Sequence, residues 1–261
     1  MKKKDLLFAP KDRIIFALDV NTVGKATDLV KLLHPHVGMF KIGLELITTM
    51  LVQVVAAKSE EEANDLLAEI RELFVLLDGN IFWDGKFDDI PNTVGAAAKV
   101  LGSIDVKMFN VHASATVDGL AKAVANKGDA LVLAVTVLTS TDSDESELVF
   151  GSSSRAKVLQ YARHAVLADC DGVVCSPLEL DLYRKHAELS DLLKVTPGIR
   201  DKDAPPDDQK RTMTAYEAIV AGADLLVIGR PIAAAPDPVV AAIAFAAQIN
   251  DGLNFLESKK Q

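Results

Sequence analysis

A single-domain α/β fold of the TIM (β/α)8 barrel class is predicted by the repeat, length and apolar pattern of the sequence. Eight β-rich segments alternate with helical patterns over about 250 residues, the size typical of this barrel. Most of the segments are continuously apolar, as expected of parallel strands that are buried on both faces. A doubly wound sheet is the alternative, but it usually has fewer strands or a second domain. No linker rich in Pro, Gly or Ser divides the chain, so we expect one domain over residues 1–261.

The predicted strands follow one another at regular spacing. In chain order they are 13–20 (RIIFALDV), 39–44 (MFKIGL), 81–86 (IFWDGK), 108–113 (MFNVHA), 130–138 (ALVLAVTVL), 172–176 (GVVCS), 193–199 (LKVTPGI) and 225–230 (LLVIGR). Segments such as TVGKATDLVKLLH and TAYEAIVAGA lie between them and carry apolar residues at helical spacing.

The connection at about 44–80 is enlarged and contains two helical stretches. The second begins at Ser59, a good N-cap that is followed by three glutamates in the first turn. Its apolar stripe is predicted to pack on the barrel, with a partner-binding role as the alternative. The stripe consists of Leu66, Leu67, Ile70, Leu73 and Phe74.

Composition narrows the classes of function. Hydrophobic residues make up 49% of the chain, which is ample for a large core, and the net charge of −9 argues against nonspecific binding of nucleic acid or anionic membrane. The initial apolar segment is too short for a signal sequence, and no run approaches the roughly 18 apolar residues of a membrane span. Cys170 and Cys175 are expected to be reduced packing residues, and the histidines show no metal-ligand spacing. We therefore expect a cytoplasmic protein.

Charged and polar residues gather where the predicted strands end, which in a barrel is the face that carries the chemistry. They are Asp19, Lys41, Asp84, Lys86, His112, Thr139, Pro197, Gly198, Arg200, Gly229 and Arg230. The pattern D-x-K-x-x-D from Asp84 to Asp89 lies on this face, although such a pattern alone is more often an exposed turn. VIGRP closes the last unit, where barrels commonly bind phosphate; a turn glycine beside a surface arginine is the alternative.

Taken together, these motifs resemble the orotidine 5′-monophosphate decarboxylase family from about Arg13 to the final helix. The resemblance rests on ALDV, FKIGLEL, DGKFDDIPNT, AVTVLTS, DGVVCS, VTPGIR, DQKRTMTA and VIGRP, in that order. Gly85 stands where the family commonly has leucine, and Ala215 where it often has proline. Neither departure removes a charged site residue.

The resemblance implies decarboxylation of orotidine 5′-monophosphate to UMP without a metal or cofactor. It gives Lys86 the role of stabilising the C6 carbanion and donating the proton. Asp84 and Asp89 would keep Lys86 protonated, and Lys41 would complete an alternating row of lysines and aspartates. Such a row is neutral overall, which limits the cost of burying it.

The resemblance also implies the substrate contacts. Asp19 and Lys41 would bind the ribose, and Thr139 the pyrimidine, with Pro197 nearby. Gln209, Gly229 and Arg230 would bind the phosphate, with Arg200 close by. The polar segment 200–210 is expected to be a mobile loop that closes over the phosphate, with an ordinary loop as the alternative.

The simplest interpretation of the sequence is one site per chain, but the resemblance implies a two-fold homodimer. In it, Asp89 and Thr93 would enter the partner's site, and Ile90 is also expected to bind the substrate. Two other functions stay open at this point: a metal-dependent phosphosugar decarboxylase or aldolase with a similar D-x-K-x-x-D pattern, and a catalytically inactive nucleotide-binding barrel. TPGIR and DQKR favour the nucleotide enzyme over the first.

Overall fold

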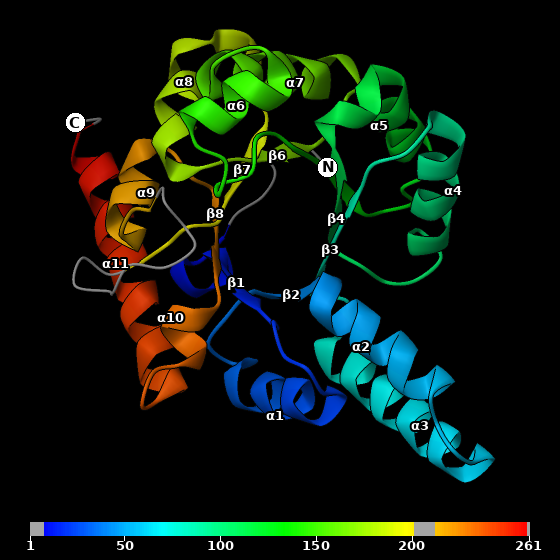
Figure 1. Cartoon of the computed structure of the whole chain (residues 1–261). Helices are drawn as coiled ribbons and strands as arrows, with labels where there is room; N and C mark the ends of the chain where they lie inside the picture. The colour runs from blue at the N-terminus through cyan, green and yellow to red at the C-terminus, as the bar shows by residue number, and fades with distance from the viewer. Residues whose placement is uncertain (1–7, 201–211, 260–261) are drawn as a thin grey trace.

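The computed structural model describes residues 8–200 and 212–259. Within these residues, eight parallel strands form a closed barrel in which each strand pairs with the next and β8 pairs with β1 (Figure 1). The strands are β1 (Ile14–Ala17), β2 (Met39–Gly43), β3 (Ile81–Phe87), β4 (Met108–His112), β5 (Leu131–Val135), β6 (Gly172–Val174), β7 (Leu193–Thr196) and β8 (Leu225–Ile228). The predicted TIM (β/α)8 fold is therefore confirmed.

Two layers of apolar side chains explain why the strand segments are continuously apolar. Alternate strand residues fill the barrel interior, while Phe16, Phe40 and Phe109 belong to a larger cluster that packs under the surrounding helices. The interior cluster consists of Ile15, Met39, Phe82, Met108, Leu131, Leu133, Leu193, Val195 and Leu225. This packing leaves the ends of the strands as the natural place for polar groups.

Helices enclose the barrel in the order in which they follow the strands (Figure 1). They are α1 (Val23–Leu33), α2 (Leu44–Val55), α3 (Glu60–Leu77), α4 (Pro91–Leu101), α5 (Thr116–Ala125), α6 (Ser143–Phe150), α7 (Ser154–Leu167), α8 (Leu180–Lys185), α9 (Ala215–Ala221), α10 (Arg230–Ala233) and α11 (Pro238–Ser258). Short 3-10 turns are η2 (Pro10–Arg13), η3 (Ala113–Ala115), η4 (Pro177–Glu179) and η5 (Ala187–Leu189).

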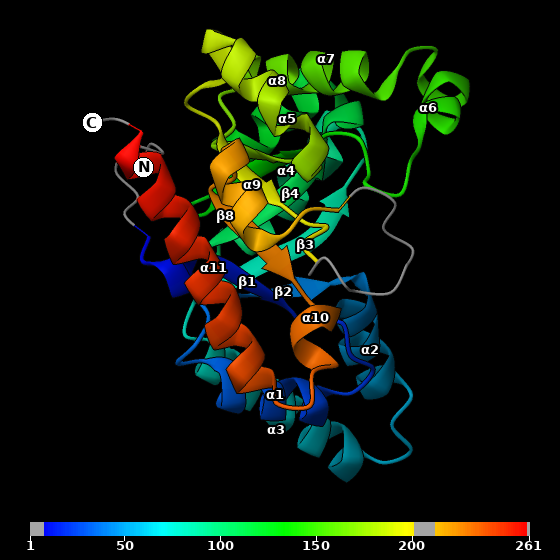
Figure 2. The ribbon, with the colours of Figure 1, turned by 90° about the vertical axis from the view of Figure 1, so that its left-hand side faces the viewer.

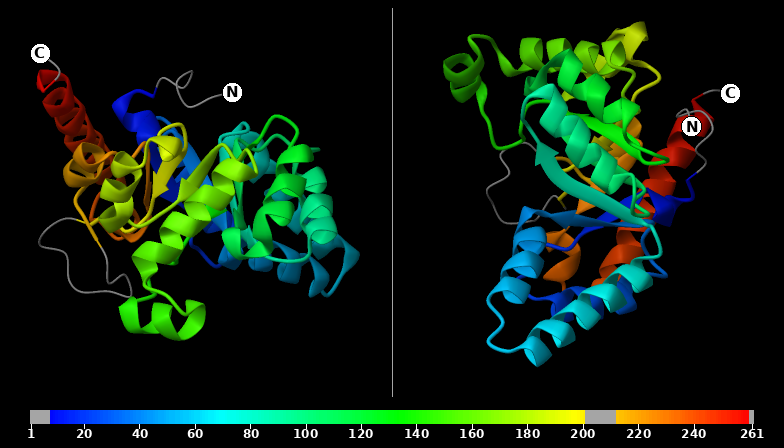
Figure 3. Two further views of the ribbon diagram at one scale, coloured as in Figure 1. Left: turned by 90° about the horizontal axis from the view of Figure 1, so that it is seen from above. Right: turned by 90° about the vertical axis from the view of Figure 1, so that its right-hand side faces the viewer.

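The enlarged connection forms two helices, α2 and α3, which run side by side and project away from the strands (Figure 3). Ser59 caps α3 as predicted, because its hydroxyl accepts the N–H of Glu62 at 3.1 Å. The predicted packing stripe is only partly correct. Leu73 is buried, and Ile70 and Phe74 pack against the core, but Leu67 lies on the exposed, projecting part of the helix.

The last helix, α11, is long and apolar enough to cross a membrane by length and composition, so the expectation that no segment approaches such a span is wrong. In the fold, α11 lies along the outside of the barrel beside α9 and α10 (Figure 2). Phe245 and Ile249 are buried there, and Asp237 caps the helix by accepting the N–H groups of Val239 and Val240. Its apolar face is thus explained in part by packing within the barrel.

Gly172 lies so close to the neighbouring strand that its position is predicted to admit only glycine. A Cβ atom at Gly172 in β6 would lie 2.4 Å from the carbonyl oxygen of Leu193 in the paired strand β7. Gly172→Ala should therefore lower the free energy of unfolding by about 1–3 kcal/mol, measured by urea denaturation. Gly24→Ala in α1 is the control, because a Cβ atom added there would meet no neighbouring group within 4 Å. Equal stability of the two variants would contradict this account of the strand contact.

Candidate active site

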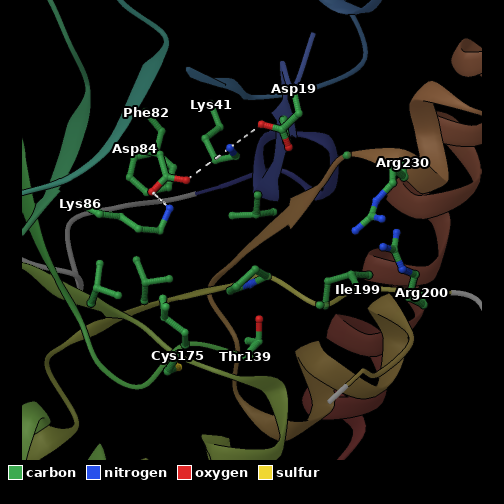
Figure 4. A pocket seen from close by; sticks show the side chains of 18 of the residues that line it. Asp19, Lys41, Phe82, Asp84, Lys86, Thr139, Cys175, Ile199, Arg200 and Arg230 are labelled. Carbon is green, nitrogen blue, oxygen red and sulfur yellow. Dashed lines mark hydrogen bonds and ion pairs between the residues drawn. The ribbon is translucent and has the colours of Figure 1, made fainter. Parts of the chain in front are cut away.

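A cavity opens at the carboxyl ends of the strands and brings most of the predicted site residues together (Figure 4). Predicted residues that line it are Asp19, Lys41, Asp84, Lys86, Thr139, Pro197, Arg200, Gly229 and Arg230. They come from strand ends and loops that are distant in sequence, and barrel closure makes them neighbours.

An unbroken row of opposite charges crosses one side of this cavity. The ammonium group of Lys41 donates to Asp19 at 2.9 Å and lies 3.3 Å from a second carboxylate, that of Asp84. The other oxygen of Asp84 accepts from Lys86 at 2.7 Å. The row therefore runs from the end of β1 across β2 to the end of β3, with two positive and two negative groups.

Pairing keeps the inner members of the row ionised despite their depth. Burial alone would raise the pKa of Asp84, but the charges of Lys41 and Lys86 outweigh it and lower that pKa. Burial alone would lower the pKa of Lys41, but Asp84 and Asp19 raise it overall. The side chain of Lys86 is 32% exposed against 11% for Lys41, so Lys86 is the more accessible of the two lysines of the row.

The row depends on an irregularity in β3. Trp83 pairs with Phe109 of β4, but the next β3 residue in register is Phe87, which pairs with Val111. Three β3 residues thus stand opposite the single residue Asn110, and Lys86 adopts a left-handed backbone with φ of 46°. For a residue other than glycine, this conformation costs about 1–2 kcal/mol, so neighbouring groups must hold it.

Asn110 is the polar residue of the site that the sequence analysis did not single out. Its side-chain oxygen accepts the backbone N–H of Lys86 at 2.7 Å, and its amide nitrogen donates to Asp84 at 2.6 Å. It is completely buried. The one feature of the sequence that could have indicated Asn110 is that it places an amide in the otherwise apolar start of the segment MFNVHA.

Arginines stand on the opposite side of the cavity from the charged row. Arg200 follows β7 and Arg230 follows β8, and Figure 4 shows their guanidinium groups turned toward each other. Gly229 allows a close approach there, because a Cβ atom on it would lie 3.1 Å from that of Ala17. Gln209 and nearly all of the predicted loop 200–210 lie outside the described residues.

Asp89, Ile90 and Thr93 do not line the cavity of their own chain. All three are exposed, and the carboxylate of Asp89 accepts the N–H of Ile90 at 2.6 Å. Among the ion pairs of residues 8–200 and 212–259, none joins Asp89 to Lys86. Within one chain, the alternating row is therefore completed by Asp19 rather than by Asp89.

The pKa values of two further groups near the cavity, His112 and Cys175, are shifted in the direction that favours the neutral form. Burial lowers the pKa of His112, aided by the charge of Lys86 and opposed by that of Asp88. Cys175 lines the cavity floor as a free thiol, and burial raises its pKa to about 12. In the described part of the chain, no group of three or more His, Cys, Asp or Glu side chains is arranged to hold a metal ion.

Comparisons with known proteins identify the family of this chain. The sequence model of the orotidine 5′-phosphate decarboxylase / HUMPS family matches residues 12–245. The chain is 42% identical to the orotidine 5′-phosphate decarboxylase of Geotalea daltonii over 92% of its own length and 97% of the relative's. It is 41% identical to that of Moorella thermoacetica over 92% of each chain.

Solved structures give the same result. The crystal structure of orotidine 5′-phosphate decarboxylase from Lactobacillus acidophilus matches with a TM-score of 0.70 and 30% identity, covering 91% of this chain and 98% of that one. The family match and the curated relatives each span most of the chain. The protein therefore belongs to the orotidine 5′-phosphate decarboxylase / HUMPS family.

Proposed function

We propose that Lys86 carries out the chemical step of this enzyme, the decarboxylation of orotidine 5′-monophosphate to UMP in pyrimidine biosynthesis. That reaction follows from the family and from relatives that are named for it. The observation that carries the proposal is the row Asp19–Lys41–Asp84–Lys86, whose most exposed ammonium faces the cavity.

The reaction breaks the bond between C6 and the carboxylate, and CO₂ leaves while the electron pair stays on C6. Lys86 stabilises this developing charge with its ammonium and then transfers a proton from Nζ to C6, which forms UMP. The neutral amine recovers its proton from water. The fixed ammonium needs no reorganisation as charge develops, which is the largest contribution that such a site offers.

Asp84 has two roles in this proposal. It fixes the ammonium of Lys86 at 2.7 Å, and it faces the carboxylate of the substrate. Their repulsion is relieved as CO₂ departs. Lys41 balances the charge of Asp84 and, together with Asp19, binds the ribose hydroxyls.

The opposite side of the cavity binds the rest of the nucleotide. Thr139 and Pro197 contact the pyrimidine, while Arg200, Arg230 and the N–H groups near Gly229 bind the phosphate, with Gln209 assigned there from sequence. Two guanidinium groups turned toward one space are suited to an anion that carries two charges (Figure 4). The phosphosugar branch of the family is the alternative, but the relatives from Geotalea daltonii and Moorella thermoacetica are orotidine 5′-phosphate decarboxylases.

The active unit is proposed to be a cytoplasmic homodimer in which Asp89 and Thr93 complete the partner's site, with Ile90 between them. Support comes from their absence from the cavity of their own chain and from the 67% exposure of Ile90. Exposed apolar residues at the nearby start of α2 and along it also indicate a covered surface; they are Leu44, Leu51 and Val52. The two buried, free cysteines suit a reducing compartment.

Lys86→Ala should reduce kcat by at least about 10³-fold, because it removes a group that acts mainly in the transition state. UMP affinity, measured by calorimetry, should stay within about tenfold of wild type. Lys99→Ala, on the exposed face of α4, is the matched control and should leave kcat unchanged. A Lys86→Ala enzyme with kcat within about tenfold of wild type would rule out Lys86 as the proton donor.

Arg230→Ala should weaken UMP binding by about 10- to 100-fold, the effect expected for the loss of a charge-assisted contact. Uridine lacks the phosphate, so its affinity should change by less than about threefold. Arg163→Ala, on the outer helix α7, provides the arginine control. Equal losses for UMP and uridine would show that Arg230 does not contact the phosphate.

Mixed dimers test whether Asp89 is shared. Lys86→Ala and Asp89→Ala subunits are each expected to be inactive, but a mixed dimer has one site with both changes and one with neither. After complete random exchange in equal amounts, activity per site should recover to about a quarter of wild type. Absence of recovery, with mixed dimers detected by native mass spectrometry, would place Asp89 in the site of its own chain.

A further inference from the structure

We propose that Asn110 is a positioning residue for the decarboxylation. Its amide spans the β3 irregularity, binds the backbone of Lys86 and the carboxylate of Asp84, and so holds the two side chains within hydrogen-bond distance. This inference rests on the role proposed for Lys86. Asn110 does not line the cavity, so it acts through the two residues that do.

The first support is the interrupted ladder between β3 and β4. Regular pairing stops after Trp83 and resumes at Phe87, so the intervening backbone lacks its usual strand partner. The Asn110 oxygen replaces that partner for the N–H of Lys86, at 2.7 Å. It thereby holds Lys86 in its left-handed conformation, with φ of 46°.

The second support is the chemistry of the amide. The bridge needs an acceptor for a backbone N–H and, beside it, a donor for a carboxylate. A primary amide supplies both from one planar group, and these two partners fix which end is oxygen and which is nitrogen. A carboxylate at position 110 would face Asp84 with like charge, and an aliphatic side chain would leave two buried polar groups unpaired.

The third support is the position of Asn110 on its strand. Phe109 and Val111 belong to the apolar cluster under the helices, and Met108 to the cluster inside the barrel. Alternation therefore places Asn110 on the inner face, one step above Met108, where an apolar residue would simply continue the core. A completely buried amide at this point is best explained by the two groups it connects.

Two variants separate the contributions of the bridge. Asn110→Leu keeps similar volume but removes both hydrogen bonds, whereas Asn110→Asp keeps the acceptor for Lys86 and replaces the donor to Asp84. Val111→Ala is the matched control, because it removes buried side-chain packing from the same strand without touching the bridge.

We expect kcat to fall by about 10²-fold in both Asn110 variants, since small displacements of reacting groups have effects of this size. Affinity for UMP should change by less than about fivefold. Val111→Ala should lower Tm yet keep kcat within about twofold of wild type. A fall in kcat that occurs in the Asn110 variants and not in the destabilised Val111→Ala control is a change that general destabilisation would not produce.

The pH profile adds a second signature. The charged and polar groups facing Asp84 are Lys41 from β2, Lys86 from β3 and Asn110 from β4. All three help to lower the pKa of Asp84 against the effect of burial, so losing the Asn110 donor must raise it. In a plot of kcat against pH, the fall in kcat on the acidic side should move to higher pH in both variants. The shift should be larger in Asn110→Asp because of the added negative charge.

Crystal structures of the variants distinguish failure of this inference from failure of the proposed role of Lys86. The inference predicts that in Asn110→Leu the Lys86 ammonium moves beyond hydrogen-bond distance of Asp84, from 2.7 Å in the parent. If that contact persists, or if folded Asn110→Leu has kcat within about threefold of wild type, the positioning role is wrong. If Asn110→Leu does not fold, Asn110→Asp decides by the same kcat and pH criteria. An inactive wild-type enzyme would instead overturn the proposed function. The crystal structure of Asn110→Leu would then still decide whether Asn110 positions Lys86 against Asp84.

Discussion

The carboxylate of Asp84 contacts two ammonium groups at once, with Lys41 on one oxygen and Lys86 on the other. A carboxylate at this depth would be protonated or destabilising without such partners. Lys41 comes from β2, whereas Lys86 lies on β3 with Asp84 and its backbone N–H is held by Asn110 of β4, so the geometry exists only when the barrel places β2, β3 and β4 side by side. The fold therefore does more than bring Lys86, the proposed proton donor, to the cavity. It assembles the counter-charges that allow a protonated lysine and an ionised aspartate to coexist in a partly dry site.

The barrel also separates two electrostatic tasks. The strands β1 to β3 carry a row whose charges cancel, which suits a site that must stabilise a carbanion. The ends of β7 and β8 carry Arg200 and Arg230, whose positive charge suits a phosphate (Figure 4). In the function proposed above, a nucleotide would span both regions, so its phosphate would be bound by groups that do not interfere with the charge balance around C6. A chain with a net charge of −9 thus concentrates positive charge at this side of the cavity.

The sequence predicted the barrel because buried parallel strands must be continuously apolar, and it predicted which residues share the cavity because charges follow the strand ends. It could not predict the β3 irregularity, since a shift of register depends on the partner strand and leaves no local pattern. Asn110 was missed for the same reason: one amide in an apolar segment does not reveal what lies across the ladder. Periodicity also overestimated the packing of Leu67, because it cannot tell how far a helical pair extends beyond the barrel. The apolar character of α11 is underestimated when only uninterrupted apolar runs are considered, because a few polar residues interrupt its apolar ones.

The thiol of Cys175 lies in the floor of the cavity, and its pKa of about 12 has a consequence for the enzyme under oxidative stress. The raised pKa keeps this thiol protonated at neutral pH, whereas the thiolate is the form that reacts with peroxides and alkylating agents. The other cysteine, Cys170, is also buried, and its pKa is raised to about 12 as well. Pyrimidine synthesis through this enzyme should therefore continue when redox conditions in the cell inactivate enzymes that depend on a reactive cysteine.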